Sequence, residues 1–224
     1  MGVLGAESSP PLPPPSPGFK HCYRKAHMAL MKVLIGVPCN WPTVPVQFVE
    51  SLCDLRRPPV SEVRFMREPM LDIMRNKLAD MAVEGGFSHL FMLDVDMLYP
   101  PDSLMSLLRD DVDVVCGLAC RRTAPHVPVC LQPTDERFVF EVQVPEKRGL
   151  LKCGAVGGGG TLIKTDVFRA MEPPYFSYQH RMPNGDRVGE DLYFCQMAAD
   201  VGKGVYCRTD LVYPHMITAA VAVD

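Results

Sequence analysis

Apolar runs alternate with stretches of helical spacing over the first half of the chain, and this alternation constrains the fold more than any other feature. Residues 32–38 form a continuous apolar run that ends at a proline, as expected of a strand buried on both faces. Three further strands are predicted at 61–66, 88–93 and 113–118. Helices are predicted at 46–55, at 102–108 and from Met70 to Gly85-Gly86. This order predicts an α/β fold, with a mostly parallel sheet flanked by helices and right-handed crossovers.

The rhythm changes after about residue 120. Short strands are predicted at 127–131 and 138–144, and glycines 157–160 interrupt an apolar stretch at 150–163. A helix at 190–199 and a short strand at 205–208 follow. The sequence therefore predicts a smaller, irregular, β-containing second half.

The domain boundaries follow from the same pattern. Residues 1–30 form a proline-rich leader that cannot fill a core, and we expect them to be disordered. Residues 31–224 are predicted to form one domain, in which 31–120 would bind a nucleotide and 121–224 would supply the acceptor and catalytic half.

Composition excludes several classes of protein. The 224 residues are 47% hydrophobic and 22% charged, with a net charge of −3, which is ordinary for a globular chain. No apolar run approaches the roughly 18 residues of a membrane span. We therefore expect a soluble, cytoplasmic protein, and the acidic balance does not favour a nucleic-acid acceptor, although one stays open.

The nine cysteines include no Cys-x-x-Cys pair, and most lie in apolar runs. This usage is typical of reduced, buried thiols. A zinc site could be drawn through Cys116, Cys120, Cys130 and Cys153, but their spacings match no ligand pattern.

Asp94-Val95-Asp96 directly follows the predicted strand at 88–93. Ligand sites of open parallel sheets gather beyond the carboxyl ends of strands, where this motif would lie. Two carboxylates on one face of an extended segment favour a hard divalent cation between or near them. The alternative is a solvated corner in which both aspartates form turns or cap a helix.

Two other polar features have equally plain alternatives. Glu190-Asp191 opens a predicted helix after Gly189, where an acidic residue is often only a cap. His215 follows an apolar segment near the C-terminus, and a single histidine is more often structural than a ligand.

Taken in order, these features resemble the GT-A nucleotide-sugar glycosyltransferases, particularly the compact family-two-like enzymes of bacteria and viruses. The resemblance covers residues 31–216 and rests on a set of segments in the family's order: Val33–Pro38, Met74–Leu78, Phe91–Met97, Gly158–Ile163, Gly189–Cys195 and Pro214-His215. It implies a GT-A (Rossmann-like) fold and the transfer of a sugar from a nucleotide-sugar donor, with UDP- or GDP-sugars favoured, to an unidentified acceptor.

The resemblance also implies roles for individual residues. Asp94 and Asp96 match the Asp-x-Asp motif that binds Mn²⁺ or Mg²⁺ and the donor diphosphate, and His215 matches the histidine that completes the metal shell. Asp191, with Glu190 beside it, matches the general base of inverting enzymes. Contacts with the donor or the cleft are implied for Pro38, Asn40, Arg75, Asn76, Gly158, Gly159 and Gly160.

Two basic segments are less specific. The loop 178–189 contains Arg187 and could order over the donor phosphates, or it could be an ordinary surface loop. Arg121-Arg122, after the strand at 113–118, could steer an anion or could simply be exposed.

The residues leave a second class of function open, a non-catalytic module that binds a nucleotide or a sugar on the same scaffold. Nucleotidylyltransferases of related fold are disfavoured because Val37–Asn40 lacks their glycine-rich signature. Phosphatases of the haloacid dehalogenase type are disfavoured because Leu98 replaces the threonine of their motif.

Overall fold

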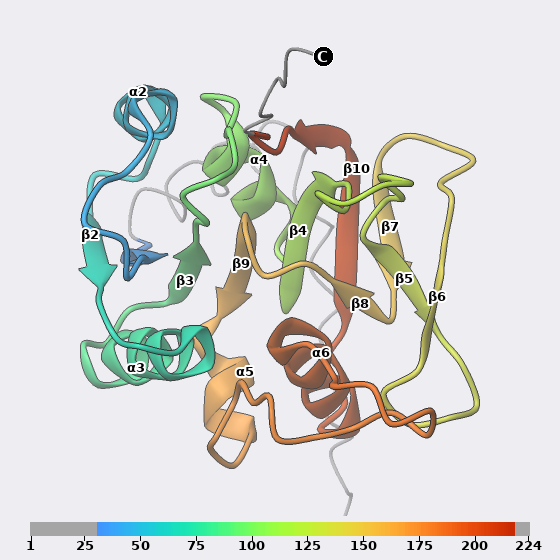
Figure 1. Ribbon diagram of the computed structural model, residues 1–224. Coiled ribbons are helices and arrows are strands. Elements are labelled where there is room, and N and C mark those ends of the chain that lie inside the picture. Colours follow the sequence, from blue (N-terminus) through green and yellow to red (C-terminus); the bar gives the residue numbers. More distant parts are fainter. Residues whose placement is uncertain (1–30, 218–224) are drawn as a thin grey trace, which may run out of the picture.

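The computed structural model describes residues 31–217, and a seven-stranded sheet forms its centre (Figure 1). In chain order, the elements are β1 (Val33–Pro38), α2 (Val46–Asp54), β2 (Ser61–Met66), α3 (Leu71–Glu84), β3 (His89–Met92), α4 (Ser103–Asp110), β4 (Val114–Ala119), β5 (Cys130–Pro133), β6 (Phe140–Val142), β7 (Leu150–Cys153), β8 (Ala155–Val156), β9 (Thr161–Lys164), α5 (Thr165–Ala170), α6 (Glu190–Asp200) and β10 (Val205–Tyr213).

The sheet is mostly parallel and its strand order is β2-β1-β3-β9-β4-β10-β7. Strand β1 pairs in parallel with β2 and β3, and β4 pairs in parallel with β10. Strand β9 lies antiparallel between β3 and β4, and β7 is antiparallel to β10 at the edge. The remaining five strands, β2, β1, β3, β4 and β10, therefore point the same way.

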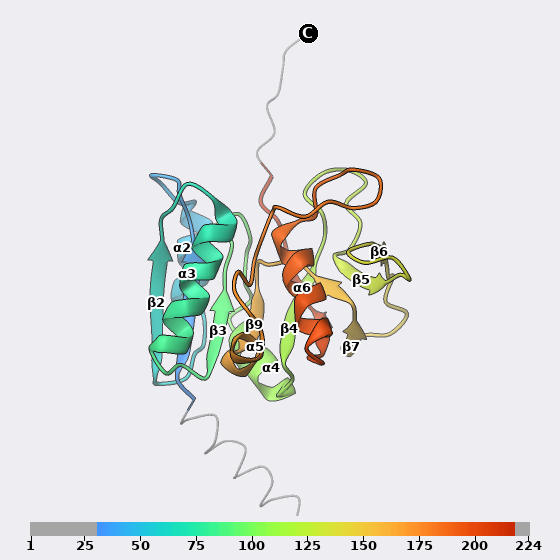
Figure 2. The same cartoon turned by 90° about the horizontal axis from the view of Figure 1, so that it is seen from below.

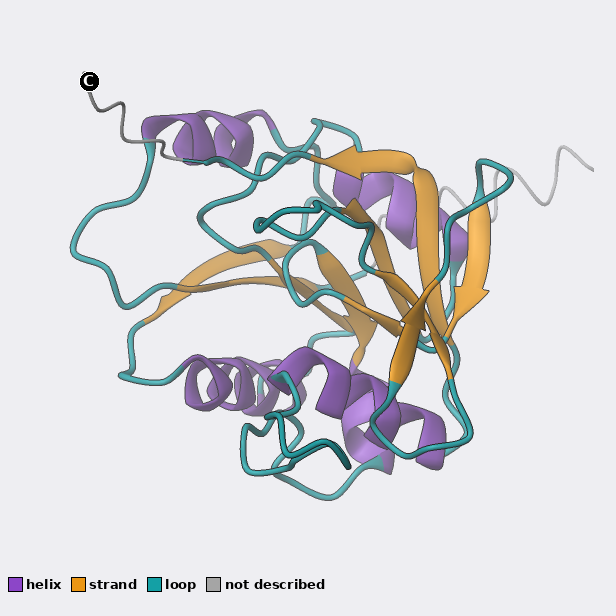
Figure 3. Cartoon of the chain, turned by 45° about the vertical axis from the view of Figure 1, so that its right-hand side comes forward, coloured by secondary structure: helices purple, strands orange, loops and turns teal. Residues whose placement is uncertain are grey.

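Helices cover both faces of this sheet. Helices α3, α5 and α6 lie on one face, and α2 and α4 lie on the other (Figures 2 and 3). Every residue of β1 and of β3 is buried, as the continuous apolar runs require when both faces are covered. The predicted α/β class, a mostly parallel sheet flanked by helices, is confirmed.

A second, three-stranded sheet of order β6-β5-β8 stands beside the main one, next to β7 in Figure 1. All its pairings are antiparallel. This small sheet is the irregular β-containing part that the sequence predicted for the second half.

The sequence located the elements of residues 31–120 well and those of the second half less well. The apolar stretch at 150–163 contains three strands, β7, β8 and β9, and helix α5 was not predicted. Strand β5 begins at Cys130 and not at residue 127. Strand β10 continues to Tyr213, beyond the predicted end at residue 208. Its register with β4 shifts between Arg208 and Val212, so the polar residues there interrupt the pairing but do not end the strand.

The predicted leader, residues 1–30, lies outside the described residues. Within residues 31–217, none of the helices is both long and apolar enough to cross a membrane.

Candidate functional site

The residues of interest gather at the carboxyl ends of four of the five strands that run in the same direction. Pro38 ends β1 and Asn40 follows it, Asp94 and Asp96 follow β3, and His215 follows β10. Arg121-Arg122 follows β4 in the same way. Because carboxyl ends of parallel strands meet at one edge of a sheet, segments far apart in the sequence share one site there.

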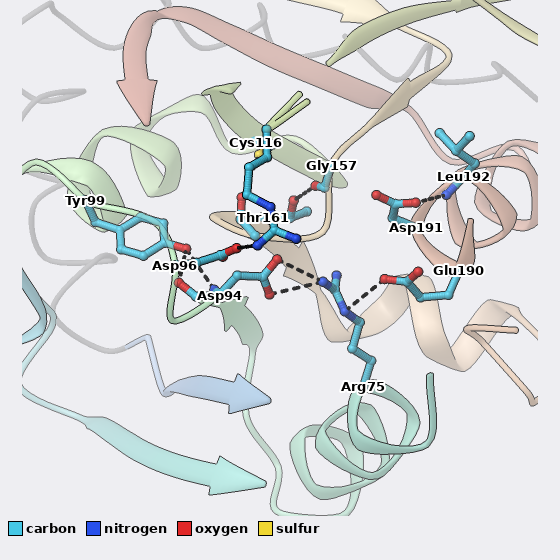
Figure 4. A network of polar contacts seen from close by, with 12 residues as sticks. Arg75, Asp94, Asp96, Tyr99, Cys116, Gly157, Thr161, Glu190, Asp191 and Leu192 are labelled. Carbon is cyan, nitrogen blue, oxygen red and sulfur yellow. Dashed lines mark hydrogen bonds and ion pairs between the residues drawn. The ribbon is translucent and has the colours of Figure 1, made fainter. Parts of the chain in front are cut away.

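Asp94 is held by two side chains from other elements. Arg75 of α3 donates from Nη2 to both carboxylate oxygens of Asp94, each at 3.1 Å (Figure 4). The Tyr99 hydroxyl accepts from the backbone N–H of Asp94 at 2.8 Å and donates to its carbonyl oxygen at 3.1 Å. Backbone and carboxylate of Asp94 are therefore both fixed.

Arg75 is a buried cation that links the two groups of acidic residues. Its side chain is 2% exposed, and its Nε lies 3.4 Å from Oε1 of the buried Glu190 at the start of α6. Burial opposes the charge of the guanidinium, but the carboxylates of Asp94, Glu190 and Asp191 outweigh it, so the pKa of Arg75 is raised. Arg75 thus stays charged and joins α3 to both Asp94 and α6.

The glycine run packs directly against this ion pair. A Cβ on Gly158 would lie 1.3 Å from Nη1 of Arg75, and a Cβ on Gly159 would lie 2.6 Å from Oδ2 of Asp94. Gly160 has a φ of +82°, which favours glycine. A side chain at residue 158 or 159 would clash with Arg75 or Asp94, and the backbone conformation at residue 160 favours glycine, so the run lies against the Arg75–Asp94 pair.

Backbone pairing places His215 beside the Asp-x-Asp segment. Leu98 N–H donates to Pro214 O at 2.9 Å, and Met216 N–H donates to Asp96 O at 2.8 Å. The Nδ1 atom of His215 is buried and has no hydrogen-bond partner among the described residues. Burial raises the pKa of the Asp94 carboxyl, and the nearby Arg75 and, to a smaller extent, His215 work in the opposite direction.

Asp94, Asp96 and His215 suit a hard divalent cation, since two carboxylates and an unpartnered buried imidazole nitrogen supply the donors that Mg²⁺ or Mn²⁺ accepts. In this conformation, however, Arg122 makes an ion pair with Asp96 at 2.7 Å, while Arg75 holds Asp94. Within residues 31–217, no group of three or more His, Cys, Asp or Glu side chains is arranged to hold a metal ion. Arg122 is exposed and would have to move away from Asp96.

Asp191 is the second residue of α6 and lies on the far side of Arg75 from Asp94 (Figure 4). Its Oδ1 accepts from the Leu192 N–H at 2.8 Å. Burial, followed by the adjacent Glu190, raises the pKa of Asp191 to about 6. A carboxylate with that pKa is ionised at neutral pH and is a better proton acceptor than an ordinary aspartate.

A pocket of about 400 Å³ opens next to Asp94 and Asp96. Segments that follow β1, β2 and β3 line it, and Pro38, Asn40, Trp41 and Tyr178 are among its residues. Trp41 is 60% exposed and the chain's single tryptophan, so the pocket wall carries an accessible aromatic face.

Two predicted site residues have other surroundings. The side chain of Asn76 points to the segment after α5, where Oδ1 accepts from the N–H groups of Tyr175 and Phe176 at 2.7 and 3.1 Å. Arg187 is exposed and its backbone pairs with Arg181, and its side chain makes no hydrogen bond or ion pair within residues 31–217. The structure thus brings neither side chain to the Arg75–Asp94 pair.

Two tyrosines at the site were not predicted from the sequence. Tyr178 lines the 400 Å³ pocket, and burial, followed by the nearby Glu190 carboxylate, raises the pKa of its hydroxyl. Tyr99 holds the backbone of Asp94. Neither tyrosine belongs to a motif. Tyr178 begins the loop 178–189 before Glu190, and Tyr99 follows the Asp-x-Asp segment, and these positions were the only signals in the sequence.

A larger pocket, of about 480 Å³, lies at the opposite edge of the sheet between Lys32, His89 and Lys164. Its lining charges are engaged: Lys164 pairs with Asp111 at 2.7 Å, and Arg169 pairs with Asp166. Volume alone would have placed the site there. We favour the smaller pocket because Asp94, a carboxylate whose pKa is raised, lines it together with the segments at the carboxyl ends of the strands.

Comparison with known proteins gives structural relatives only. No protein-family model matches the chain, and no curated protein matches its sequence. The crystal structure of A197 from STIV is similar with a TM-score of 0.61 at 19% identity, over 84% of this chain and 87% of that one. The inositol-1-phosphate CTP transferase from T. maritima aligns with a TM-score of 0.43 at 13% identity, over 83% and 89%. The likeness to A197 shows that this chain shares its mostly parallel, helix-flanked α/β fold.

Proposed function

We propose that the chain is a metal-dependent glycosyltransferase that moves a sugar from a nucleotide-sugar donor to an acceptor hydroxyl with inversion. One observation carries the proposal. Asp94 and Asp191, the latter with a raised pKa, lie next to the buried Arg75, and Asp96 and the buried imidazole nitrogen of His215 lie beside Asp94 at a pocket on the carboxyl edge of the sheet.

The donor would lie in the 400 Å³ pocket, with its nucleoside against the segments after β1 and β2. Asp94, Asp96 and His215 would hold a Mg²⁺ or Mn²⁺ ion. When bound, that ion supplies positive charge against the diphosphate leaving group. Arg75 holds Asp94 in place from behind, and the close approach at Gly158 and Gly159 keeps this arrangement compact.

Asp191 would act as the general base. Its carboxylate would take the proton from the acceptor hydroxyl while that oxygen attacks the anomeric carbon from the face opposite the leaving group, which gives inversion. Glu190 pairs with Arg75, so it serves to position the start of α6. The acceptor would approach from the side of residues 121–190.

A non-catalytic nucleotide- or sugar-binding module is the second candidate. It is favoured by the ion pairs of both aspartates, because Arg75 and Arg122 already balance their charges without a metal. Such a module would bind a donor but would not release its nucleoside diphosphate.

A thermal-shift screen tests the proposal. UDP-, GDP-, CDP- and dTDP-sugars are added to the full chain with and without Mn²⁺, and we expect one nucleotide to raise the unfolding temperature only when metal is present. Asp96→Asn should abolish this metal-linked rise. Asp102→Asn is the matched control, because Asp102 is another arginine-paired aspartate and does not line the pocket.

Release of the nucleoside diphosphate, measured on the stabilising donor, separates the two candidates. Metal-linked stabilisation with turnover supports the transferase, and stabilisation without turnover supports the binding module. An Asp96→Asn protein that responds like the parent would remove Asp96 from the metal site.

A further inference from the structure

Of the two arginines that pair with the Asp-x-Asp segment, Arg122 is the one that can be displaced at little cost. Its Nη1 donates to Oδ2 of Asp96 at 2.7 Å, and its side chain is 57% exposed. Arg75 is 2% exposed and is held by both Asp94 and Glu190 (Figure 4). An exposed ion pair contributes far less to stability than a buried one. A ligand that competes for these carboxylates would therefore displace Arg122 and leave Arg75 in place.

The segment that carries Arg122 allows its side chain to move. Residues 120–126, in the connection between β4 and β5, are all exposed. A backbone hydrogen bond closes this connection, in which Arg121 N–H donates to Val127 O at 2.8 Å. Release of the Arg122 side chain from Asp96 would leave that hydrogen bond intact.

The carboxylate that Arg122 occupies has a second donor atom in its neighbourhood. Met97, next to Asp96, pairs with His215 through the backbone. The Nδ1 atom of His215 is buried and has no hydrogen-bond partner among the described residues. A divalent cation can take an oxygen and an imidazole nitrogen together, whereas the Arg122 guanidinium bonds only the oxygen of Asp96 here.

Charge balance links the position of Arg122 to metal binding. Arg75 and Arg122 together offset the charges of Asp94 and Asp96, so the segment offers a cation no net negative charge while Arg122 stays paired. The guanidinium would also repel an incoming cation. Once Arg122 leaves, the Asp96 carboxylate is unbalanced, and a hard divalent cation takes such an oxygen.

We propose that Arg122 and a divalent cation compete for Asp96, so that the cation binds only after it has displaced the arginine. This inference rests on the proposed function, in which Asp96 is a metal ligand. Arg122 neutralises Asp96 in the metal-free chain and attaches the connection between β4 and β5 to the Asp-x-Asp segment. Arg122 is thus a positioning residue that lowers the affinity of the site for metal.

Isothermal titration calorimetry of the full chain with Mn²⁺ alone tests the competition. Arg122→Gln removes the competing charge and should bind Mn²⁺ about fivefold more tightly than the parent, as expected when an exposed ion pair no longer has to be broken. Arg122→Lys keeps the charge and should bind as the parent does. Arg121→Gln is the matched control, because it removes the same charge from the adjacent exposed residue, with which Asp96 is not paired. It should change the affinity by less than about twofold.

Asp96→Asn, made alone and together with Arg122→Gln, distinguishes a failure of this inference from a failure of the proposed function. Tighter binding by Arg122→Gln that is lost in the double variant supports the competition. Suppose instead that Asp96→Asn abolishes binding, but Arg122→Gln and Arg121→Gln have equal affinities. That result would overturn the competition and retain the metal site. Absence of Mn²⁺ binding by every one of these proteins, each shown to be folded by circular dichroism, would overturn both.

Discussion

At the scale of the residue, the contact between Gly158 and Arg75 is the tightest that an added Cβ would make at any glycine of residues 31–217. The buried guanidinium occupies the space that a side chain at residue 158 would need, so any substitution there must displace Arg75 from Asp94 and Glu190. Separating a buried cation from its partners leaves uncompensated charge, which destabilises proteins by about 3–5 kcal/mol.

Gly158→Ala is accordingly expected to lower the free energy of unfolding by about 3 kcal/mol or more. Gly157→Ala is the matched control, because a Cβ there meets only a Val129 methyl, at 3.7 Å. That change should be neutral or stabilise by about 0.4–1 kcal/mol. Urea unfolding of both variants provides the measurement, and equal stability for the two would contradict the packing described here.

Asp191 governs the expected pH dependence of sugar transfer. The base must be ionised, and the pKa of Asp191 in the folded chain is raised to about 6. The kcat/KM for transfer should therefore be constant above that pH and fall tenfold per pH unit below it. Asp191→Asn should remove the activity but preserve metal-linked donor binding. A kcat/KM that stays constant down to pH 5 would show that Asp191 is not the general base.

The sequence could identify the acidic members of the site, because Asp94, Asp96 and Glu190-Asp191 lie at strand and helix ends where ligands collect. It could not reveal that Arg75 is buried among them. A basic residue in a helix normally faces solvent, and only the packing of α3 under Gly158 and Asp94 turns this one inward.

At the scale of the element, Asn76 fastens α3 to the chain after α5. Its Nδ2 donates to Phe176 O at 2.7 Å, and its Oδ1 accepts from the Tyr175 and Phe176 N–H groups. Because these backbone groups belong to buried residues, loss of the amide leaves polar atoms without partners.

Asn76→Ala should therefore destabilise the chain by about 1–3 kcal/mol. Asn184→Ala, in an exposed turn where the side chain contacts Asp186, should change stability by less than about 0.5 kcal/mol. Thermal unfolding distinguishes the two. If Asn76→Ala were as stable as Asn184→Ala, the hydrogen bonds of the Asn76 side chain would contribute nothing to the stability of the folded state.

The elements of the first half follow from the sequence because each fully buried strand reads as a continuous apolar run. The sequence does not predict β7, β8 and β9 separately, because glycines divide this stretch into short segments whose pairing partners are distant in the chain. Helix α5 has only six residues, too few for a helical period to show.

At the scale of the whole molecule, the two halves share one sheet. Strand β9 lies between β3 and β4, and β10 lies beside β4. Residues 31–120 alone would leave facing edges of β3 and β4 without a partner.

We therefore expect residues 31–120 to be unfolded or aggregated when expressed alone, and residues 31–217 to unfold in a single transition. Circular dichroism and amide proton dispersion would report either state. A fragment with well-dispersed amide signals would show that the first half folds without β9, contrary to this expectation.

The position of β9 also determines when the central sheet can be completed during synthesis. Translation at about 5–20 residues per second leaves several seconds between the emergence of β3 and that of β9, which ends at Lys164. Throughout that interval the facing edges of β3 and β4 in the nascent chain have no strand between them. Chaperones that shield strand edges would have their main opportunity on this chain then, before the ribosome has delivered the strand that closes it.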